Sequence, residues 1–463
     1  MASSSSSNSF LLCLLVTTLL VFSHVDRSEQ KVRYHEVSLH SSFPSKACST
    51  SSSKHSAISN VTTTLRVVHR DGPCSPLQRR PALSPEQILG KDQARVNSLH
   101  RRISGVSASA SSSGLQPEAA GVTVRKGSPV ATGEYIVTVG IGTPRRDQTL
   151  IVDTGSDITW IQCEPCVVHC HTQIDPIFNP ARSSTYSNIS CSSAFCSELD
   201  INGCDSGSGN CIYGVLYGDD SYTTGFYARD KLTLTPGDEI ADFRFGCGQN
   251  NLGLFGQADG LLGLGGDKPS LVSQTREKYG GVFSYCLPSS PSGTGSLYLG
   301  GYPSSTKVEF TPMVIDPTMP TFYNLNLKAI SVAGKPVPVA AAMFKKAGMI
   351  IDSGTVITRL PPKAYAALRD AFRLAMSRYR RAAEVSILDT CYNLTGYGSV
   401  TVPAVELEFD GNVKVALDAS GVLYKASESQ VCLAFAANDD DDDAGILGNV
   451  QQQKFDVVYD VSK

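Results

Sequence analysis

The chain has 463 residues, more than a single hydrophobic core usually supports, so at least two folded units are expected. Forty Lys and Arg against 43 Asp and Glu give a formal net charge of −3, without the strongly basic balance of a nucleic-acid-binding protein, and we expect no nucleic-acid partner. Fourteen cysteines indicate disulfides if the chain enters an oxidising compartment.

The N-terminus carries a short apolar run from Phe10 to Phe22. It is shorter than the roughly 20 apolar residues that span a bilayer, so residues 1–25 are predicted to be a secretory signal peptide. No Lys or Arg precedes the run, and the stretch is Ser-rich and free of acidic residues, which leaves a plastid transit peptide as an alternative. No later run is long enough to cross a membrane, and we expect no stable membrane anchor.

Residues 26–126 are basic, with 15 Lys and Arg against 7 Asp and Glu, whereas the rest of the chain carries 25 against 36. A net charge of +8 before one of −11 predicts a propeptide held electrostatically on an acidic body. The alternative is a basic disordered linker, which the Ser-rich stretch 107–113 resembles. The apolar spacing from Gln87 to Ile103 predicts a helix. Three basic pairs are candidate processing sites: Arg79-Arg80, Arg101-Arg102 and Arg125-Lys126.

From residue 127 onward, most of the chain is predicted to form short β-strands between Gly, Ser, Pro and Asp turns. Apolar or alternating stretches of this kind are 135–142, 231–234 and 455–459. One clear helix is predicted after Pro361-Pro362, and we interpret it as scaffold. Its apolar stripe runs from Tyr365 to Tyr379, with Arg378, Arg380 and Arg381 at its C-terminal end.

Two short segments of the body are near copies of each other. Residues 151–156 read Ile-Val-Asp-Thr-Gly-Ser, residues 350–355 read Ile-Ile-Asp-Ser-Gly-Thr, and an Ile-Thr pair follows each one residue later. The two acidic residues, Asp153 and Asp352, lie 199 residues apart. Each copy is followed by an apolar pair closed by Gly, at 260–264 and 445–449, as expected for a buried strand. The repeat predicts two similar lobes that each contribute one carboxylate to a shared site.

Two other clusters raise the question of metal binding. Cys163, Cys166 and Cys170, with His169 and His171 nearby, have a spacing that zinc could use, but a secreted protein favours disulfides. The run 439–443 of five Asp residues is most simply a solvated loop, and calcium is the alternative, although the spacing of an EF-hand loop is absent. We expect no metal and no cofactor.

Further segments carry a family resemblance. They are Trp160, seven residues after Asp153; Tyr217-Gly218-Asp219-Asp220-Ser221; Phe245-Gly246-Cys247-Gly248; Phe283-Ser284-Tyr285-Cys286; Gly448-Asn449-Val450-Gln451-Gln452-Gln453; and, before the body, 68–76 (Val-His-Arg-Asp-Gly-Pro-Cys-Ser-Pro). From about Gly133 to its C-terminus the chain resembles the pepsin-type aspartic proteases, specifically the plant nepenthesin-like branch. The resemblance implies an all-β-dominated, bilobal pepsin-like β-barrel fold with a few short helices. The active-site cleft would lie between an N-terminal lobe (127–312) and a C-terminal lobe (313–463).

The resemblance also implies a role for each motif residue. Asp153 and Asp352 would form the catalytic dyad, and two carboxylates a hydrogen bond apart share one proton because their like charges raise one pKa; aspartic-protease dyads are the standard example of this coupling. The supporting residues divide into cross-braces (Thr154, Ser353), glycines that let backbone N–H groups approach (Gly155, Gly354) and hydroxyl donors (Ser156, Thr355). Tyr217 would lie on a flap and be braced by Trp160. Asp220 replaces a Gly that the family usually has in the flap.

By the same resemblance the protein is expected to be an aspartic endopeptidase active at acidic pH. It would be a monomer that binds a peptide substrate as an extended strand and is made as a zymogen with its own propeptide as inhibitor. We expect secretion to the apoplast, with vacuole or plastid as alternatives. The alternative function is a catalytically silent or weakened pepsin-fold binding or inhibitor protein. Related silent members lack an intact Asp motif, whereas both motifs are intact here.

Disulfide pairs are likewise implied by the resemblance alone. They are Cys163–Cys166, Cys170–Cys247, Cys191–Cys211, Cys196–Cys204 and Cys391–Cys432, which leaves Cys286 unpaired. Family members continue beyond Tyr459 with a Gly-containing strand and a final Cys, so we expect the C-terminal lobe to be truncated and Cys286 to lack its partner. Asn188 and Asn393 head glycosylation motifs.

Overall fold

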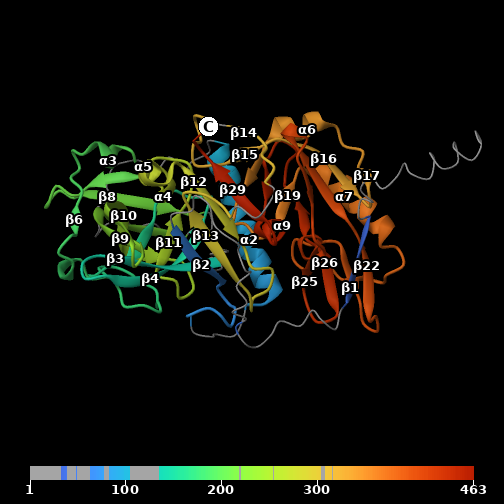
Figure 1. Ribbon diagram of the computed structural model, residues 1–463, viewed down its shortest axis with the longest axis horizontal. Helices are drawn as coiled ribbons and strands as arrows, with labels where there is room; N and C mark the ends of the chain where they lie inside the picture. Colours follow the sequence, from blue (N-terminus) through green and yellow to red (C-terminus); the bar gives the residue numbers. More distant parts are fainter. Residues whose placement is uncertain are drawn as a thin grey trace, which may run out of the picture.

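The computed structural model describes residues 33–38, 48, 63–77, 83–104, 135–217, 221–253, 255–303, 308–314 and 316–462. The predicted signal peptide, the Ser-rich stretch, two of the basic pairs and Asp220 lie outside these residues. The described chain forms two largely β-sheet halves with helix α2 lying between them (Figure 1).

One large sheet of 13 strands forms the N-terminal half and continues toward the molecule's centre. Its order is β29 (Asp456–Asp460), β12 (Val282–Cys286), β13 (Thr294–Leu299), β2 (Thr63–His69), β3 (Tyr135–Ile141), β4 (Arg146–Asp153), β11 (Gly260–Gly263), β5 (Trp160–Gln162), β10 (Asp238–Leu252), β9 (Tyr222–Thr235), β8 (Cys211–Leu216) and β7 (Asn202–Cys204), with β6 (Ser187–Asn188) paired to β9. Because β3 also pairs with β9, the strands from β3 to β9 close into a barrel.

The C-terminal half is built from smaller sheets. The six-stranded sheet has the order β14 (Met313–Val314), β15 (Asn324–Leu325), β18 (Met349–Ile351), β28 (Gly445–Leu447), β19 (Thr358–Leu360) and β27 (Phe435–Ala437). The first four-stranded sheet contains β17 (Lys335–Pro336), β16 (Leu327–Val332), β23 (Val405–Phe409) and β24 (Lys414–Ala416). The second contains β20 (Arg381–Ala382), β21 (Cys391–Asn393), β26 (Gln430–Leu433) and β25 (Leu423–Lys425).

The helices in the part of the chain that the structure describes are few, and most are single turns. They are α2 (Pro85–Ile103), α3 (Ala194–Ser197), α4 (Leu271–Gln274), α5 (Arg276–Tyr279), α6 (Ala341–Ala347), α7 (Pro362–Ala375), α8 (Ala419–Val422) and α9 (Asn449–Gln452), with 3-10 turns at Pro180–Arg182 and Asp410–Asn412. None of the helices in the described residues is long and apolar enough to cross a membrane.

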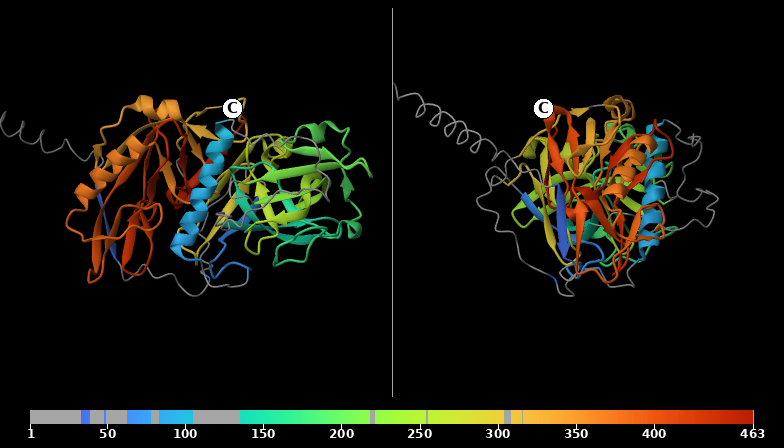
Figure 2. Two further views of the ribbon diagram at one scale, coloured as in Figure 1. Left: turned by 180° about the vertical axis from the view of Figure 1, so that it is seen from behind. Right: turned by 90° about the vertical axis from the view of Figure 1, so that its right-hand side faces the viewer.

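The described residues before β3, which we call the N-terminal segment, contact both halves. Strand β1 (Tyr34–Ser38) pairs with β22 (Ser399–Pro403) at the far end of the C-terminal half. Strand β2 is an interior strand of the large sheet, and its alternating burial matches a strand with one face in the core. Helix α2 runs across the junction of the two halves, as the rear view in Figure 2 shows.

Helix α2 confirms the helix expected from the apolar spacing. Ser84 caps its N-terminus in a capping box with Gln87, and Pro85 occupies the first turn, where a missing N–H is tolerated. Leu89, Val96 and Leu99 are buried, as an amphipathic helix laid on a protein surface requires. Asp92 is buried on the same helix, which the apolar pattern did not indicate.

Helix α7 exists where it was expected but is shorter than its apolar stripe suggested. It ends at Ala375, so Arg378, Arg380 and Arg381 lie beyond it, and the basic residue of its last turn is Arg373. Met376 and Tyr379 remain buried because the chain continues along the same core surface after leaving the helix.

A buried carboxyl group supports the start of strand β11. Asp259 is fully buried and accepts a hydrogen bond from the backbone N–H of Thr149 at 2.6 Å. Burial, together with the neighbouring Asp175, raises the pKa of Asp259 to about 9. The unfolded chain ionises this group near pH 4, so folding stability should fall as pH rises from about 4 through about 9.

We therefore expect Asp259→Asn, whose amide stays neutral at every pH, to melt at a higher temperature than the wild type at pH 8 and at a similar temperature near pH 4. Thermal melts at both pH values measure the difference. Asp147→Asn is the control, since the Asp147 side chain is 55% exposed. An Asp259→Asn variant that loses as much stability as the wild type between the two pH values would contradict the assignment.

Candidate active site

The two Asp loops meet at the junction of the halves. Asp153 ends β4, which runs parallel to β11, and Asp352 follows β18, which runs parallel to β28. The Gly-closed apolar strands that the sequence paired with each Asp are therefore the immediate neighbours of the two Asp strands. Both carboxylates are buried, at 1% and 0% exposure.

Each carboxylate accepts the same pair of hydrogen bonds from its own loop. Asp153 accepts the Gly155 N–H at 3.0 Å and the Ser156 hydroxyl at 2.6 Å. Asp352 accepts the Gly354 N–H at 2.9 Å and the Thr355 hydroxyl at 2.5 Å. Donors of this kind stabilise a carboxylate in its charged form.

The glycines also let the two loops approach. A Cβ on Gly155 would lie 2.9 Å from Oδ1 of Asp352, and a Cβ on Gly354 would lie 2.7 Å from Oδ1 of Asp153. Both distances are shorter than side chains tolerate, so the loops can face each other only with glycine at these two positions.

Beneath the carboxylates the loops are tied to each other. The backbone N–H of Ser353 donates to the Thr154 hydroxyl at 2.9 Å, and the Thr154 N–H donates to the Ser353 hydroxyl at 3.2 Å. The two hydroxyls lie 3.3 Å apart. These reciprocal hydrogen bonds fix the position of the two halves relative to each other beneath the carboxylates.

A second set of contacts supports the loop of Asp352 from below, through side chains for which no role was predicted. The Gln452 amide donates to the carbonyls of Asp352 (3.1 Å) and Leu447 (2.7 Å), and the Tyr285 hydroxyl bonds to Gln452 and to Tyr459. The Asn449 amide donates to the Ser353 carbonyl at 3.1 Å. The motif 448–453 is thus a support for the second Asp loop.

Arg95 of α2 lies between the two carboxylates. Its Nη2 donates to Oδ1 of Asp153 at 2.6 Å and to Oδ1 of Asp352 at 2.9 Å, while its Nε donates to Oδ2 of Asp352 at 2.9 Å. Burial acts to raise the pKa of Asp153, but the Arg95 guanidinium and the hydrogen bonds from Ser156 and Gly155 outweigh it and hold that pKa below its ordinary value of 3.8. The guanidinium thus occupies the point between the carboxylates and supplies the opposite charge there.

Tyr217 and Trp160 meet beside the site. The Trp160 indole N–H donates to the Tyr217 hydroxyl at 2.8 Å. Phe255, for which no role was predicted, packs edge-on against both rings, with centroid distances of 4.8 Å to Trp160 and 5.7 Å to Tyr217. The contacts with Trp160 and Phe255 hold the side chain of Tyr217, the last described residue before the gap at 218–220.

A second buried charge pair joins α2 to the C-terminal half. The Arg359 guanidinium lies 2.8 Å from Asp92, and both side chains are fully buried. Asp92 also accepts the backbone N–H groups of Val356 (2.6 Å) and Ile357 (3.2 Å). Neither residue of this ion pair was predicted to have a role.

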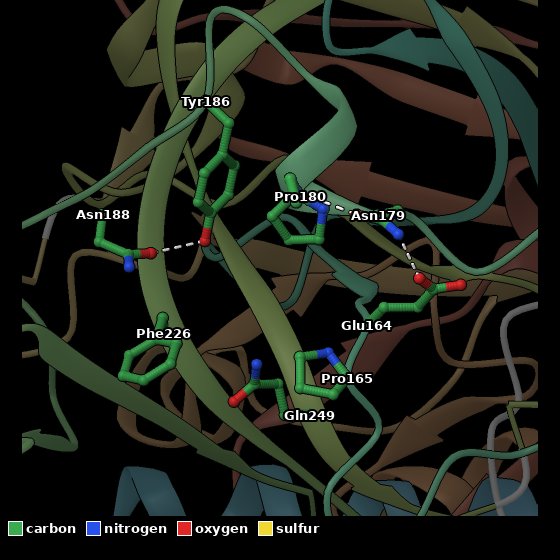
Figure 3. Close-up of a pocket in the computed structure, with 9 residues that line it drawn as sticks. Glu164, Pro165, Asn179, Pro180, Tyr186, Asn188, Phe226 and Gln249 are labelled. Carbon is green, nitrogen blue, oxygen red and sulfur yellow. Dashed lines mark hydrogen bonds between the residues drawn. The ribbon is translucent and has the colours of Figure 1, made fainter.

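A separate hollow lies on the N-terminal half. Figure 3 shows Tyr186, Asn188, Phe226 and Gln249 among the residues that line it. The Tyr186 hydroxyl donates to the side-chain oxygen of Asn188 at 2.6 Å, and Asn188 is exposed. Its lining includes neither Asp153 nor Asp352, so this hollow is distinct from the paired carboxylates.

Four of the five expected disulfides in the body are wrong. The structure pairs Cys163–Cys247, Cys166–Cys170, Cys191–Cys204 and Cys196–Cys211, in place of Cys163–Cys166, Cys170–Cys247, Cys191–Cys211 and Cys196–Cys204. Cys391–Cys432 is present, as is Cys48–Cys74 within the N-terminal segment. Strand pairing explains the first exchange, because β5 lies beside β10 and leaves the Cα atoms of Cys163 and Cys247 5.3 Å apart.

Cys163, Cys166 and Cys170, the cysteines considered as zinc ligands, are all bonded to other cysteines, so none of them carries a free thiol in the structure. In the acidic run, Asp441 binds Lys363 at 2.6 Å and Asp443 faces His100 of α2 at 3.7 Å. No group of three or more His, Cys, Asp or Glu in the described ranges is arranged to hold a metal ion.

Peptide mapping of the unreduced protein should recover the five body pairs as the structure has them and one free thiol in the body, Cys286. Burial raises the pKa of the Cys286 thiol to about 11, so alkylation at pH 8 should be slow until a denaturant is added. Labelling at any other body cysteine, or a Cys170–Cys247 peptide, would contradict the pairing. Cys391 and Cys432 serve as the internal control, because the family resemblance and the structure both pair them.

The fold and the paired Asp loops define a two-lobed, pepsin-like protein. A family model described as xylanase inhibitor N-terminal matches residues 135–301, and one described as xylanase inhibitor C-terminal matches residues 322–463. The chain belongs to the plant pepsin-like family of atypical aspartic proteases, as these matches and its relatives show.

The relatives are named as proteases. An aspartyl protease family protein of Arabidopsis thaliana is 48% identical over 93% of this chain and 91% of its own length. Aspartyl protease AED1 of the same plant is 46% identical over 92% of this chain and 90% of its own. Aspartic proteinase nepenthesin-2 of Nepenthes gracilis is 37% identical over 71% of this chain and 75% of its own.

Solved structures share the fold at lower identity. The soybean basic 7S globulin has a TM-score of 0.57 at 20% identity and covers 72% of this chain and 93% of that protein. The protein titled edgp has a TM-score of 0.56 at 21% identity, covering 71% and 89%. These likenesses concern the fold alone.

Proposed function

We propose that this protein is an aspartic endopeptidase that hydrolyses peptide bonds at acidic pH and is made as a secreted zymogen. The observation that carries the proposal is the mirrored pair of carboxylates, each with one N–H and one hydroxyl donor, joined by the Thr154–Ser353 brace. Names of relatives at up to 48% identity point to the same chemistry.

The chemistry follows from the geometry of the pair. When α2 is absent, two adjacent carboxylates share one proton, and a water held between them can lose a proton to the ionised member. The protonated member donates a hydrogen bond to the scissile carbonyl oxygen. The water oxygen attacks the carbonyl carbon to form a tetrahedral intermediate, and its C–N bond breaks as the pair transfers a proton to the amine nitrogen. The pair titrates as a unit, so we assign base and acid roles to the pair rather than to single residues.

Within this proposal the N-terminal segment is the propeptide. Arg95 takes the place between the carboxylates where the water would lie, and its positive charge opposes the shared proton, so the docked form has neither a free base nor an acid. Falling pH protonates the dyad and weakens this contact.

A pepsin-fold binding protein is the second candidate, because the family models are described as xylanase inhibitors and basic 7S globulin shares the fold. The two intact carboxylate loops favour the enzyme. We further propose that the substrate is an extended peptide bound by a monomer, that Asn188 and Asn393 carry glycans, and that the protein acts outside the cell.

The test is a digestion of a peptide library by the purified full chain across pH 3 to 7, with N-terminal sequencing of the protein itself. We expect cleavage between about pH 3 and 6, preceded by cutting of the chain between His100 and Thr132, and blocked by a statine-type transition-state mimic. A protein that is cut in that interval yet cleaves no peptide at any pH would favour the binding-protein alternative.

A further inference from the structure

The partners of Arg359 show which of its contacts depend on α2. Among the described residues, the side chains that bind Arg359 both come from α2, namely Asp92 at 2.8 Å and Gln93 at 3.4 Å. Its Nη1 donates to the Ile357 carbonyl at 3.0 Å, and its Nε has no hydrogen-bond partner in the described chain. Once α2 leaves, this guanidinium loses its carboxylate.

Two backbone donors lose their acceptor at the same moment. The N–H groups of Val356 and Ile357 both point at the Asp92 carboxylate, at 2.6 and 3.2 Å. Together with Arg359 they form a socket of one cation and two N–H groups around a single carboxylate. Such a set of buried donors selects a carboxylate, because an apolar side chain leaves the donors unpaired and a neutral amide leaves the guanidinium without a counter-charge.

The socket lies on the surface that a substrate would cover. Asp92 and Arg95 are three residues apart on one helix, which corresponds to about 4.5 Å along its axis. Leu89 of α2 packs beside Val356 and Ile357, and Val96 and Leu99 pack on Phe322, Ile350, Ala444 and Ile446, next to the strand that carries Asp352. An extended peptide advances about 3.3 Å per residue, so the socket lies about one or two residues from the bond at the dyad.

We propose that the open cleft contains a carboxylate-binding subsite, formed by Arg359 and the N–H groups of Val356 and Ile357, that selects substrates with an acidic side chain one or two residues from the scissile bond. The proposal rests on the proposed peptidase function and adds a substrate class to it. In the closed form, Asp92 occupies the subsite as Arg95 occupies the dyad. Asp439 is the other carboxylate whose charge acts on Arg359, and it comes from an exposed loop of the same half.

The test compares quenched fluorescent peptides that differ only by Asp or Asn at each position near the cleaved bond, using acid-processed protein at pH 5. We expect one position at which Asp raises kcat/KM by about tenfold to a hundredfold over Asn, the range of a desolvated charge-assisted hydrogen bond. The preference should fade below about pH 3.5, where the peptide Asp takes up a proton.

Arg359→Met should reduce the ratio of kcat/KM for the Asp peptide to kcat/KM for the Asn peptide to within about twofold. Arg359→Lys keeps the positive charge but cannot form a bidentate contact with a carboxylate, so it should retain part of the Asp preference. Arg229→Met removes an arginine that is 52% exposed and is the matched control. The wild-type profile needs no variant, so a misfolded Arg359→Met protein leaves the proposal testable.

The outcomes separate the two proposals. A wild type that cleaves neutral peptides but shows no position with an Asp preference overturns the subsite, as would happen if Arg359 turned to Asp439, and leaves the peptidase assignment intact. An Asp preference that survives in Arg359→Met also overturns it. A wild type that cleaves no peptide overturns the proposed function and the subsite with it.

Discussion

Replacing Asp352 with asparagine is expected to lower the peptidase activity of the processed protein by about a thousandfold, the scale of general acid–base catalysis by a positioned group. The amide oxygen of the new side chain can still accept a hydrogen bond of the kind that Asp352 accepts from the Gly354 N–H and the Thr355 hydroxyl, so the loop should keep its shape. The variant cannot share a proton with Asp153 and cannot activate water. Asp153→Asn should behave in the same way because its contacts mirror these.

The measurement is kcat/KM on one peptide at pH 4 to 5, with thermal melting to verify the fold. Asp370→Asn is the matched control, since its carboxylate is 65% exposed and its neighbour Arg369 is its ion-pair partner in the described chain. Wild-type activity in either dyad variant would show that the two carboxylates are not the catalytic pair.

Replacing Arg95 with methionine is expected to make the unprocessed protein active at a higher pH than the wild type. Arg95 holds the pKa of Asp153 below its ordinary value of 3.8 despite burial. A depressed pKa in the docked form means that the contact stabilises docking above about pH 4 and loses this contribution as pH falls through the lowered value. Without Arg95 two buried carboxylates face each other, one takes up a proton, and the dyad no longer favours the helix.

We therefore expect the pH midpoint for the onset of activity to rise by about one unit or more in Arg95→Met, with a shorter lag before peptide cleavage. Gly90→Ala should instead lower the pH midpoint for the onset of activity. A Cβ at Gly90 meets nothing within 4 Å, and alanine favours a helix by about 1 kcal/mol over glycine, so α2 should dock more tightly. Arg101→Met removes the same charge from an exposed position of α2 and is the control. An unchanged onset in Arg95→Met would show that its contact with the dyad does not maintain the closed state.

The repeated Asp loops could be predicted from sequence because their chemistry is local. A carboxylate, a glycine and a hydroxyl within four residues make each half of the site, and the structure places Asp153 and Asp352 face to face with the predicted strands beside them. The Trp160–Tyr217 contact was implied by the family resemblance, to which Trp160 was matched through its position after Asp153.

The remaining errors concern contacts between residues that are distant in sequence. The amphipathic pattern of α2 indicated a helix, but nothing local indicates that Arg95 meets a carboxylate 257 residues later. Cys163 pairs with Cys247 because two strands lie side by side, whereas the family resemblance had implied Cys163–Cys166 and Cys170–Cys247. Arg359 and Asp92 resemble ordinary surface charges until their burial is known.

Strand β2 gives the N-terminal segment a part in the architecture that is separate from covering the carboxylates. It pairs along six residues with β13 and along two with β3, between two strands of the large sheet. Withdrawing α2 uncovers a surface, whereas withdrawing β2 would divide a continuous sheet and leave two open edges. A cut between α2 and β3 therefore yields a nicked, two-chain molecule in which β2 of the shorter chain stays paired with β13 and β3 of the longer one. In such a molecule, opening of the cleft and dissociation of the shorter chain are separate events.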